Sequence, residues 1–439
     1  MDKKNIIIII VDAFRPKNLS LFGYKKETDK NLKKIAKESI LFRQFFSSSN
    51  ATAPSLTSIF TGKYPDNHGI IHQFPYTKDE EIARLQENKF WLTSFLKERG
   101  YNTFAVDWIG LWFKQDFDYY EERKERGGNK FLNIPFIKKI LLHLPSWAYT
   151  FGKKFTKARA SEQFAPPDQT MELAISKIKE SKEKEPEKPF FLFTHFWDTH
   201  FPFKTIKYKA GEKKDIGEVL KKIKSKSQRE YFKKRITDIG LYSIEDMIGK
   251  YDAAITEIDR QLGKLFKFLK KNNLWNETIL VILGDHGTNL ADHGIYFSSS
   301  ALFDDTIHVP MIMHLPGFEE KEIREFAQNV DILPTLLDYL KSDIMPENID
   351  GKSMIPLIKN NVAIRDKVFS FDGLCDDIKS VRTKSKKLIL AENPQCNLCK
   401  SEHHEKIEEY NIENDPEEKK NIFNRSSELM EFLKPESDD

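Results

Sequence analysis

Two short apolar runs, each ending in a carboxylate, constrain the fold of this 439-residue chain most strongly. Asn5–Val11 is a run of β-branched residues that ends at Asp12, and residues 279–283 lead through a glycine into Asp285 and His286. Such continuous runs are typical of strands buried on both faces of a parallel sheet. Parallel strands bring their carboxyl ends to one edge, where α/β folds bind ligands. We therefore expect an α/β protein whose functional site lies at that edge.

Helical and strand patterns alternate along the rest of the chain. Apolar periodicity predicts helices over residues 31–39, 91–99, 170–180 and 248–271, with further buried strands over 101–106 and 190–194. Short runs over 368–371, 380–382 and 387–390 predict antiparallel strands. We therefore expect a mostly parallel central sheet flanked by helices in residues 1–365, followed by a small α+β subdomain in residues 366–439.

Composition narrows the classes of function. Lys and Arg total 70 and Asp and Glu total 67, so the net charge of +3 does not favour a nucleic-acid duplex as partner. The three cysteines are too few for a disulfide framework. No apolar run is long enough for a signal peptide or a membrane span. We expect a cytoplasmic protein, and its oligomeric state stays open.

The stretch from Asn50 to Gly62 supplies a candidate nucleophile. Thr52 precedes Ala53-Pro54-Ser55, where proline suits a first helical turn and hydroxyls satisfy free N–H groups. A hydroxyl at a helix N-terminus lies in positive potential, which favours an oxyanion and an anionic substrate. On this stretch alone an ordinary capped helix explains the residues better. Only the rest of the chain favours catalysis by Thr52.

The pattern Thr52-x-Pro54-Ser55-x-x-x-x-x-Thr61-Gly62 resembles the active-site signature of the sulfatase family, within the alkaline phosphatase superfamily. The segments that begin at Asp12, Gly62, Asp198, Asp285 and Asp415 are similar to other parts of the same pattern. The resemblance runs from Asn5 to about Phe423, apart from an insertion. It implies a sulfatase-like fold, a divalent metal ion and ester hydrolysis.

The chain departs from the family pattern at four places that matter for sulfate hydrolysis. A sulfatase has Cys (converted to formylglycine) or Ser at Thr52, Arg at Leu56 and a second Asp at Ala13. Its Gly-Lys-Trp-His segment is replaced by Asp107-Trp108-Ile109-Gly110. A formylglycine diol expels sulfate by hemiacetal collapse, which threonine cannot do. Thr52 instead resembles the nucleophile of phosphoryl-transferring relatives, so we expect cleavage of phosphodiester, phosphonate or phosphomonoester substrates.

A metal site is expected from residues at the sheet edge. Asp12, Thr52, Asp285 and His286 offer two carboxylates, a hydroxyl and an imidazole. Calcium sulfatases have Asn at His286, and a nitrogen ligand moves preference toward Mn²⁺ or Zn²⁺, with Mg²⁺ and Ca²⁺ still open. Such an ion would favour the Thr52 alkoxide and offset charge in the transition state. We expect in-line attack by Thr52, a covalent phospho-threonine and release to water.

The resemblance also implies roles for residues around this site. His200 would assist the leaving group, since its imidazole titrates near neutrality, and His293 is the second choice, although a surface loop explains it equally well. Gln73 stands where related phosphonate hydrolases have a substrate-binding Asn, and Asp198 is a further substrate contact. A second metal held by Asp198, His200 and His293 stays open and would favour a two-metal phosphodiesterase.

Other functions remain open. A sulfuric ester hydrolase and a phosphoethanolamine- or phosphoglycerol-type transferase acting on a glycan or lipid are the alternatives within the family. A non-catalytic anion-binding protein is less consistent with the retention of all four ligand types. The substrate class is a small-molecule, lipid or glycan ester of phosphate or sulfate.

Two segments depart from the expected core. Residues from about 111 to 165 form an insertion, in which residues 129–161 are basic, rich in aromatic side chains and free of acidic ones. Such a segment can lie on an anionic membrane surface, so peripheral membrane contact is open, or it can close over an anionic substrate. A helical excursion packed on the main domain explains it better. Residues 204–245 are Lys-rich, and we expect an exposed helical lid there.

A second cluster of metal-ligating residue types lies near the C-terminus. Cys396-x-x-Cys399, with His403 and His404, has spacing that a zinc ion could use. The second half of a standard zinc motif is absent. A hairpin turn with free thiols therefore explains this segment better.

Overall fold

The structure is a computed structural model, and it describes residues 2–121, 165–203, 205–209, 217–236 and 243–433. The basic segment 129–161, most of the expected insertion and part of the expected lid lie outside these ranges. None of the helices in the described ranges is both long and apolar enough to cross a membrane.

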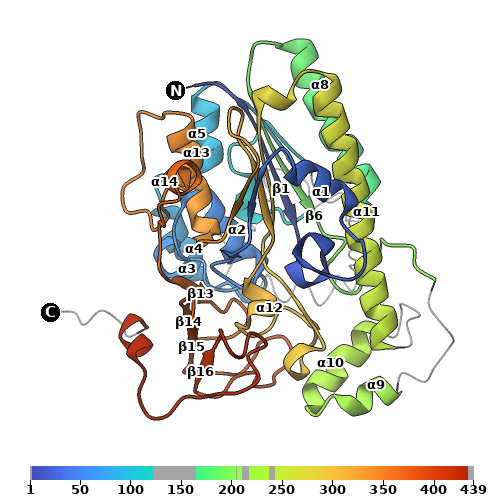
Figure 1. The fold of residues 1–439 in the computed structure, drawn as a ribbon, viewed down its shortest axis with the longest axis vertical. Helices are drawn as coiled ribbons and strands as arrows, with labels where there is room; N and C mark the ends of the chain where they lie inside the picture. Colours follow the sequence, from blue (N-terminus) through green and yellow to red (C-terminus); the bar gives the residue numbers. More distant parts are fainter. Residues whose placement is uncertain (1, 122–164, 204, 210–216, 237–242, 434–439) are drawn as a thin grey trace, which may run out of the picture.

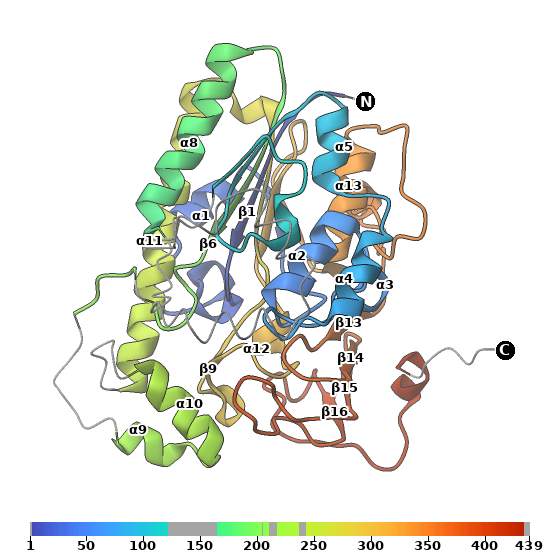
Figure 2. The same cartoon turned by 180° about the vertical axis from the view of Figure 1, so that it is seen from behind.

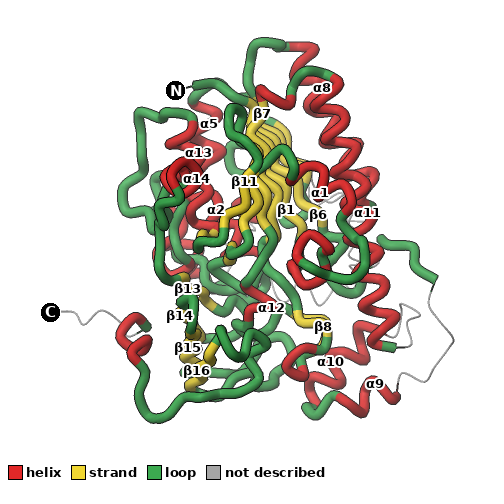
Figure 3. Tube along the Cα trace, in the orientation of Figure 1, coloured by secondary structure: helices red, strands yellow, loops and turns green. Residues whose placement is uncertain are grey.

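An eight-stranded sheet forms the centre of the molecule (Figure 3). Its strand order is β11-β2-β10-β7-β1-β6-β4-β5. The strands are β1 Asn5–Val11, β2 Ile40–Phe42, β4 Asn102–Val106, β5 Tyr119–Glu121, β6 Phe190–Phe196, β7 Thr278–Gly284, β10 Met311–His314 and β11 Lys321–Ile323. β10 runs antiparallel to its neighbours β2 and β7, and the other pairs are parallel. The expected mostly parallel sheet is confirmed.

The central strand β1 contributes to the core on both faces of the sheet. Ile6, Ile8 and Ile10 pack in one apolar cluster, whereas Ile7, Ile9 and Val11 pack in another. Each buried side chain of this size contributes about 1.5–3 kcal/mol. A sheet that is apolar on both faces needs a helical layer on each side.

Two layers of helices provide that cover (Figures 1 and 2). One face packs against α2 Thr52–Thr61, α5 Leu92–Glu98, α13 Ile332–Tyr339 and α14 Ile355–Asn360. The other packs against α1 Lys30–Ala36, α8 Pro167–Lys184 and α11 Ile244–Lys271. The expected α/β sandwich of helices around a sheet is therefore present.

Several element boundaries differ from the prediction, and three of them concern segments named above for the site or the insertion. α2 begins at Thr52 rather than after Pro54, because a proline in the first turn has no intrahelical N–H bond to lose. β6 continues to Phe196, so that His195 lies within the strand. Residues 111–121 contain a 3-10 turn, Leu111–Lys114, and the edge strand β5, so the described start of the expected insertion belongs to the main sheet.

A second sheet of four antiparallel strands follows in chain order. It comprises β13 Val368–Phe371, β14 Ile378–Arg382, β15 Lys386–Ala391 and β16 Ile407–Asn411. This C-terminal sheet lies beyond the end of the main sheet that is opposite the N-terminus (Figure 1). The backbone N–H of Phe371 donates to the carbonyl of Ser48 at 2.9 Å, which ties β13 to the segment that leads into α2.

Short elements complete the described chain. They are β3 Phe45–Phe46, β8 Asn289–Leu290, β9 Tyr296–Ser298, β12 Ala327–Gln328, α3 Pro65–His68, α4 Asp79–Gln86, α9 Gly217–Lys222, α10 Lys226–Ile236 and α12 Asp304–Ile307. The expected helices in the Lys-rich segment are α9 and α10. They are exposed on one side only, because Phe232 of α10 is buried and stacks on Phe201 and Phe297.

Candidate active site

Two buried carboxylates and one buried imidazole meet at the carboxyl edge of the main sheet. Asp12 follows β1, Asp285 follows β7, and His195 is the penultimate residue of β6. β1 pairs with both other strands, with Ile10 opposite His195. One donor atom from each of the three side chains lies within 4.8 Å of those of the other two. The register of three neighbouring strands therefore builds the centre of the site.

Thr52 and His286 complete the group. The Thr52 Oγ1 lies 3.2 Å from His286 Nε2 and 3.5 Å from Asp12 Oδ2. The hydroxyl of Ser55, one turn into α2, donates to the Asp285 carbonyl at 2.6 Å and holds the helix against the end of β7. The structure thus brings together all four residues that the sequence assigns to a metal site.

The backbone orients Asp285 and His286. Asp285 Oδ1 accepts hydrogen bonds from the N–H groups of Ala13 (3.1 Å) and His286 (2.8 Å). The His286 Nδ1 donates to the carbonyl of Gly287 at 2.8 Å, so the lone pair of Nε2 faces Thr52. A Cβ at Gly287 would lie 2.1 Å from the carbonyl oxygen of Asp305, and only glycine permits this turn.

His195 is oriented by a buried carboxylate that follows β4. Its Nδ1 donates to Asp107 Oδ1 at 3.0 Å, and its Nε2 lies 3.9 Å from Asp12 Oδ2. Burial would raise the pKa of Asp107, but the hydrogen bonds from His195 and Tyr120 hold it below its usual range. Because the ionised Asp107 accepts the proton on Nδ1, the lone pair on Nε2 points away from it and can bind a metal ion.

These residues fit a divalent cation. Asp285 Oδ2 and His195 Nε2 are fully buried and have no hydrogen-bond partner among the described residues. A buried carboxylate oxygen without a partner is costly unless a cation or donor satisfies it. Asp12, His195 and Asp285, with Thr52 and His286 beside them, offer the oxygen and nitrogen ligands that Zn²⁺ or Mn²⁺ accepts. The family whose pattern the chain resembles generally binds a divalent metal ion.

His195 and Asp107 were missed by the sequence reading. His195 is a lone imidazole in an otherwise aromatic and apolar buried strand, which was a signal for a role other than packing. Asp107 follows β4 directly, as Asp12 follows β1. The same rule about carboxylates at strand ends would have identified it.

Gln73 lies at the start of α2, next to the candidate nucleophile. Its Oε1 accepts a hydrogen bond from the backbone N–H of Ala53 at 2.8 Å. This contact satisfies one of the free N–H groups of the first turn. Only the NH₂ group of Gln73 then remains for an anionic substrate oxygen.

Asp198 forms its hydrogen bond with a residue outside this group. It is buried and accepts a hydrogen bond from the Thr205 hydroxyl. Burial raises its pKa to about 7, and the charges of Glu257 in α11 and Asp168 in α8 add to the shift. These helices cover the face of the sheet opposite α2. Within the described ranges Asp198, His200 and His293 form no ligand group, so the second metal site considered from the sequence is not built.

His200 and His293 have different surroundings. The His200 ring lies 6.1 Å from that of Trp197, whose own ring is 4.4 Å from His195. The His293 ring stacks on Phe303 at 3.7 Å, and its Nε2 is 3.6 Å from Asp305 Oδ2. His200 is therefore connected to the site through one aromatic ring, whereas His293 is held in a pair with a carboxylate.

Arg15 anchors the loop that carries His293. Its guanidinium contacts Asp292 at 2.6 Å and Asp305 at 3.1 Å, and Lys17 contacts Asp305 at 3.0 Å. Burial opposes ionisation of Asp305, but His293 and the two cations hold its pKa well below the usual range. The residue as a whole is exposed although its side chain is only 13% exposed, so His293 lies in a surface loop, as the sequence also allowed, with its ring turned onto Phe303 and Asp305.

Comparisons with known proteins cover nearly the whole chain. The family model described as Sulfatase matches residues 4–342, and the model described as N-sulphoglucosamine sulphohydrolase, C-terminal, matches residues 291–435. An arylsulfatase of Clostridium perfringens is 24% identical over 477 residues, covering 98% of this chain and 93% of its own.

Two solved structures are similar in fold. The phosphonate monoester hydrolase of Agrobacterium radiobacter has a TM-score of 0.63 at 17% identity and covers 96% of this chain and 91% of its own. A structure in complex with its substrate D-glucosamine-2-N,6-O-disulfate has a TM-score of 0.66 at 18% identity, covering 98% and 97%. At these identities the likeness shows the fold alone.

Proposed function

The chain belongs to the sulfatase family, and we propose that it cleaves phosphate esters with Thr52 as nucleophile. The expected family, the α/β fold and the class of ester hydrolase of the alkaline phosphatase superfamily are confirmed. A hydrolase of sulfate or phosphate esters follows from this membership. The choice of phosphate and the role of Thr52 are the proposal.

The contact of Thr52 with His286 carries the proposal. The Thr52 Oγ1 lies 3.2 Å from His286 Nε2, the nitrogen that would hold the metal ion, and 3.5 Å from Asp12 Oδ2, which can accept the hydroxyl proton. The positive N-terminal end of the α2 dipole favours an anionic substrate at the same place. The Thr52 hydroxyl, the group that can accept its proton and the helix end that favours an anion therefore lie together.

The reaction proceeds in two displacements. Thr52 Oγ attacks phosphorus, the P–O bond to the organic group breaks, and the departing alkoxide takes a proton, for which His200 is the candidate donor. Water then attacks the phospho-threonine, which releases phosphate and restores the hydroxyl. A divalent cation held by Asp12, His195 and Asp285 would supply positive charge to the reacting oxygens.

The surroundings of the site support phosphate over sulfate. Leu56, at the position of the sulfatase Arg, is fully buried in the apolar cluster under α2. Asp107, where the family has a cationic segment, is an acceptor for His195. The chain thus offers no Arg, Lys or His at Leu56 or in residues 107–110, where the family pattern places groups that bind sulfate. A glycan or small-molecule ester is the proposed substrate class.

A panel of aryl esters tests this function. Wild type and Thr52→Ala are loaded with Mn²⁺, Zn²⁺, Mg²⁺ or Ca²⁺ and assayed on a phosphate monoester, a phosphate diester, a phosphonate and a sulfate. Thr57→Ala, which removes another buried hydroxyl of α2, is the matched control. We expect phosphoryl cleavage that falls by at least about 10³-fold only in Thr52→Ala.

Mass spectrometry of acid-quenched enzyme gives a second readout. A phosphoryl group on the peptide that contains Thr52 supports the covalent step. Full metal-dependent turnover by Thr52→Ala contradicts it. If the sulfate ester were cleaved fastest, the substrate would be a sulfate ester, and product transferred to an added alcohol would indicate a transferase.

A further inference from the structure

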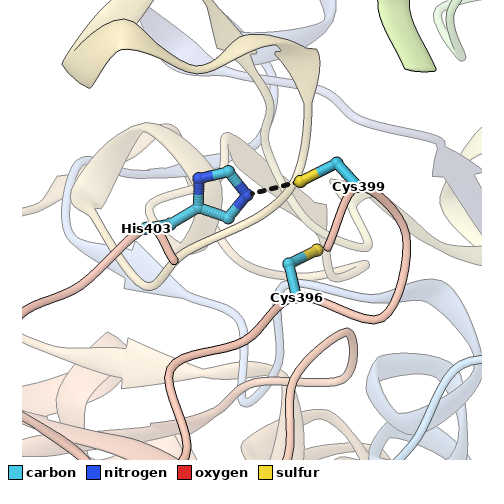
Figure 4. A group of neighbouring side chains, drawn as sticks. All are labelled: Cys396, Cys399 and His403. Atoms are coloured by element: carbon cyan, nitrogen blue, oxygen red, sulfur yellow. Dashed lines mark hydrogen bonds between the residues drawn. The ribbon is translucent and has the colours of Figure 1, made fainter. Parts of the chain in front are cut away.

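A second cluster of metal-ligating side chains lies in a loop of the C-terminal subdomain (Figure 4). Cys396, Cys399 and His403 all come from the connection between β15 and β16. One donor atom from each lies within 4.8 Å of the other two, and Cys399 Sγ is 3.0 Å from His403 Nε2. None of these residues takes part in the site around Thr52.

Cys375 brings a third thiol from a different connection. It lies between β13 and β14 and forms an isolated antiparallel bridge with Cys396. Its thiol stands outside the group of three side chains whose donor atoms lie within 4.8 Å of one another. All three cysteines are free and buried. The backbone bridge thus places a third free thiol beside Cys396, without a disulfide.

The backbone holds the Cys396–Cys399 turn in a compact form. The N–H of Lys400 donates to the carbonyl of Cys396 at 2.8 Å, and the N–H of Cys396 donates to the carbonyl of Ser401 at 2.9 Å. Lys400 has a φ of 57°, which reverses the chain after the second cysteine. This turn directs both sulfurs to the same side.

The neighbouring His404 forms hydrogen bonds with other residues. Its Nε2 accepts a hydrogen bond from the N–H of Leu302 at 3.0 Å, and its Nδ1 pairs with Glu408 at 2.5 Å. Of the two adjacent imidazoles, only His403 faces a thiol. His403 is therefore a candidate metal ligand and His404 a structural residue, a distinction that the sequence alone did not give.

We propose that Cys375, Cys396, Cys399 and His403 bind Zn²⁺ in a structural site distinct from the active site. Three thiolates and one imidazole form a tetrahedral ligand set of the kind used in structural zinc sites. The sequence lacked the second half of a zinc motif, and Cys375 supplies it from another strand connection. Free thiols in a hairpin, the preferred explanation from sequence, do not account for the convergence of Cys396, Cys399 and His403 within 4.8 Å.

Such a site would fix one wall of the region around Thr52. The loop that carries Cys375 begins at Asp372, and the N–H of Gly373 donates to Asn50 Oδ1 at 2.8 Å. The carbonyl of Gly373 accepts from the N–H of Gln73 at 2.8 Å, and a Cβ on Gly373 would lie 2.4 Å from that of Ala51. Zinc would clamp this loop onto the start of α2.

Cobalt substitution tests the site without any activity assay. The residues around Thr52 include no cysteine, so thiolate-to-Co²⁺ charge-transfer absorption reports only on the proposed site. We expect this absorption in wild type and its loss on addition of one equivalent of Zn²⁺. Cys396→Ser and Cys399→Ser should lose it, and Cys375→Ser and His403→Ala should weaken Co²⁺ binding by about 100-fold.

Controls separate the site from the active site and from unfolding. Glu402→Gln, an exposed neighbour of His403, should retain the absorption, as should Asp285→Asn. Circular dichroism shows whether each Cys variant is folded. In wild type, thiol titration should find three thiols protected by zinc and reactive after chelation. No thiolate absorption in wild type, or a disulfide in the purified protein, overturns the proposal. Unchanged Co²⁺ binding by Cys375→Ser overturns the four-ligand assignment.

Discussion

The Nδ1 of His195 lies 3.0 Å from Oδ1 of Asp107, and both side chains are fully buried. This hydrogen bond fixes the tautomer of the imidazole and turns its Nε2 toward Asp12 and Asp285. Carboxylates that orient metal-binding histidines in this way contribute to metal affinity without touching the ion. Asp107 is therefore a positioning residue, and its effect is open to measurement.

Removal of the Asp107 carboxylate should weaken metal binding. We expect Asp107→Ala to lower the affinity for Mn²⁺ or Zn²⁺ by about 10- to 100-fold, measured by calorimetry. Asp107→Asn keeps an acceptor oxygen for His195 and should lose less. Tyr120→Phe, which removes the hydrogen bond that the Tyr120 hydroxyl donates to Asp107 Oδ2, is the control. Equal affinities for Asp107→Ala and wild type would show that the hydrogen bond to His195 has no role in binding.

Replacement of His286 should change metal preference. His286→Asn substitutes an oxygen ligand for nitrogen, and we expect the ratio of Ca²⁺ to Mn²⁺ affinity to rise on the order of tenfold. His293→Asn is the matched control, because His293 faces Asp305 instead. If both variants change the ratio equally, His286 does not contact the metal.

A buried ion pair should stabilise the C-terminal sheet. The ammonium of Lys387, fully buried, lies 3.0 Å from Asp304 and 2.7 Å from Glu418. Burial raises the pKa of Glu418 to about 7, although Lys387 opposes the shift. Loss of one buried partner costs about 3–5 kcal/mol. We therefore expect Lys387→Met to lower the free energy of unfolding in urea by this amount.

The next residue provides the control for that measurement. Lys386 pairs with Glu428 at the surface, with 38% and 70% of the two side chains exposed. An exposed pair contributes about 1 kcal/mol or less. Lys386→Met should therefore change the free energy of unfolding little, and equal losses in the two variants would refute the argument from burial.

Stability near His72 should depend on pH. Its imidazole lies 2.5 Å from Glu81 and 2.8 Å from Asp376. Burial opposes protonation, but the two carboxylates raise the pKa of His72. The stabilisation is thus fully present below the unfolded value of about 6.5 and lost as pH rises through the higher folded value. His72→Gln should destabilise more at about pH 6 than at about pH 9, measured by thermal unfolding.

His68 gives the matched control for pH. Burial lowers its pKa to about 3, so it stays neutral across the same range. The loss of stability in His68→Gln should be the same at both pH values. A loss in His72→Gln that is also independent of pH would show that the pair with Glu81 and Asp376 is not ionised.

The sequence sufficed for residues that follow a strand or begin a helix. Asp12 and Asp285 are predictable because each directly follows a continuous apolar run, and Thr52 because it precedes a helix-starting proline. The role of His195 was not predicted, because the direction of its side chain depends on where β6 ends and on the register of β6 against Ile10 of β1. Those properties arise from pairing with distant strands and not from local periodicity.

Loop residues were placed less well for a related reason. The Asp198-x-His200 pattern gives the spacing of two polar side chains but not the backbone direction of the turn that carries them. His293 is held by Asp305, which is paired in turn with Arg15 from the start of the chain. Contacts between segments so far apart in sequence leave no local pattern from which to predict them.

The uniform apolar run in β1 affects how accurately the site residue Asp12 is positioned. In most strands a slip by one residue would move apolar side chains into water, but here isoleucines face both cores, so hydrophobicity alone cannot distinguish the alternatives. The polar residues at the two ends must set the alignment. Asn5 accepts a hydrogen bond from the N–H of Phe190 at 3.3 Å. A slip would carry Asp12 about 3.3 Å along the strand axis, so this asparagine, at the far end from the ligands, keeps them in place.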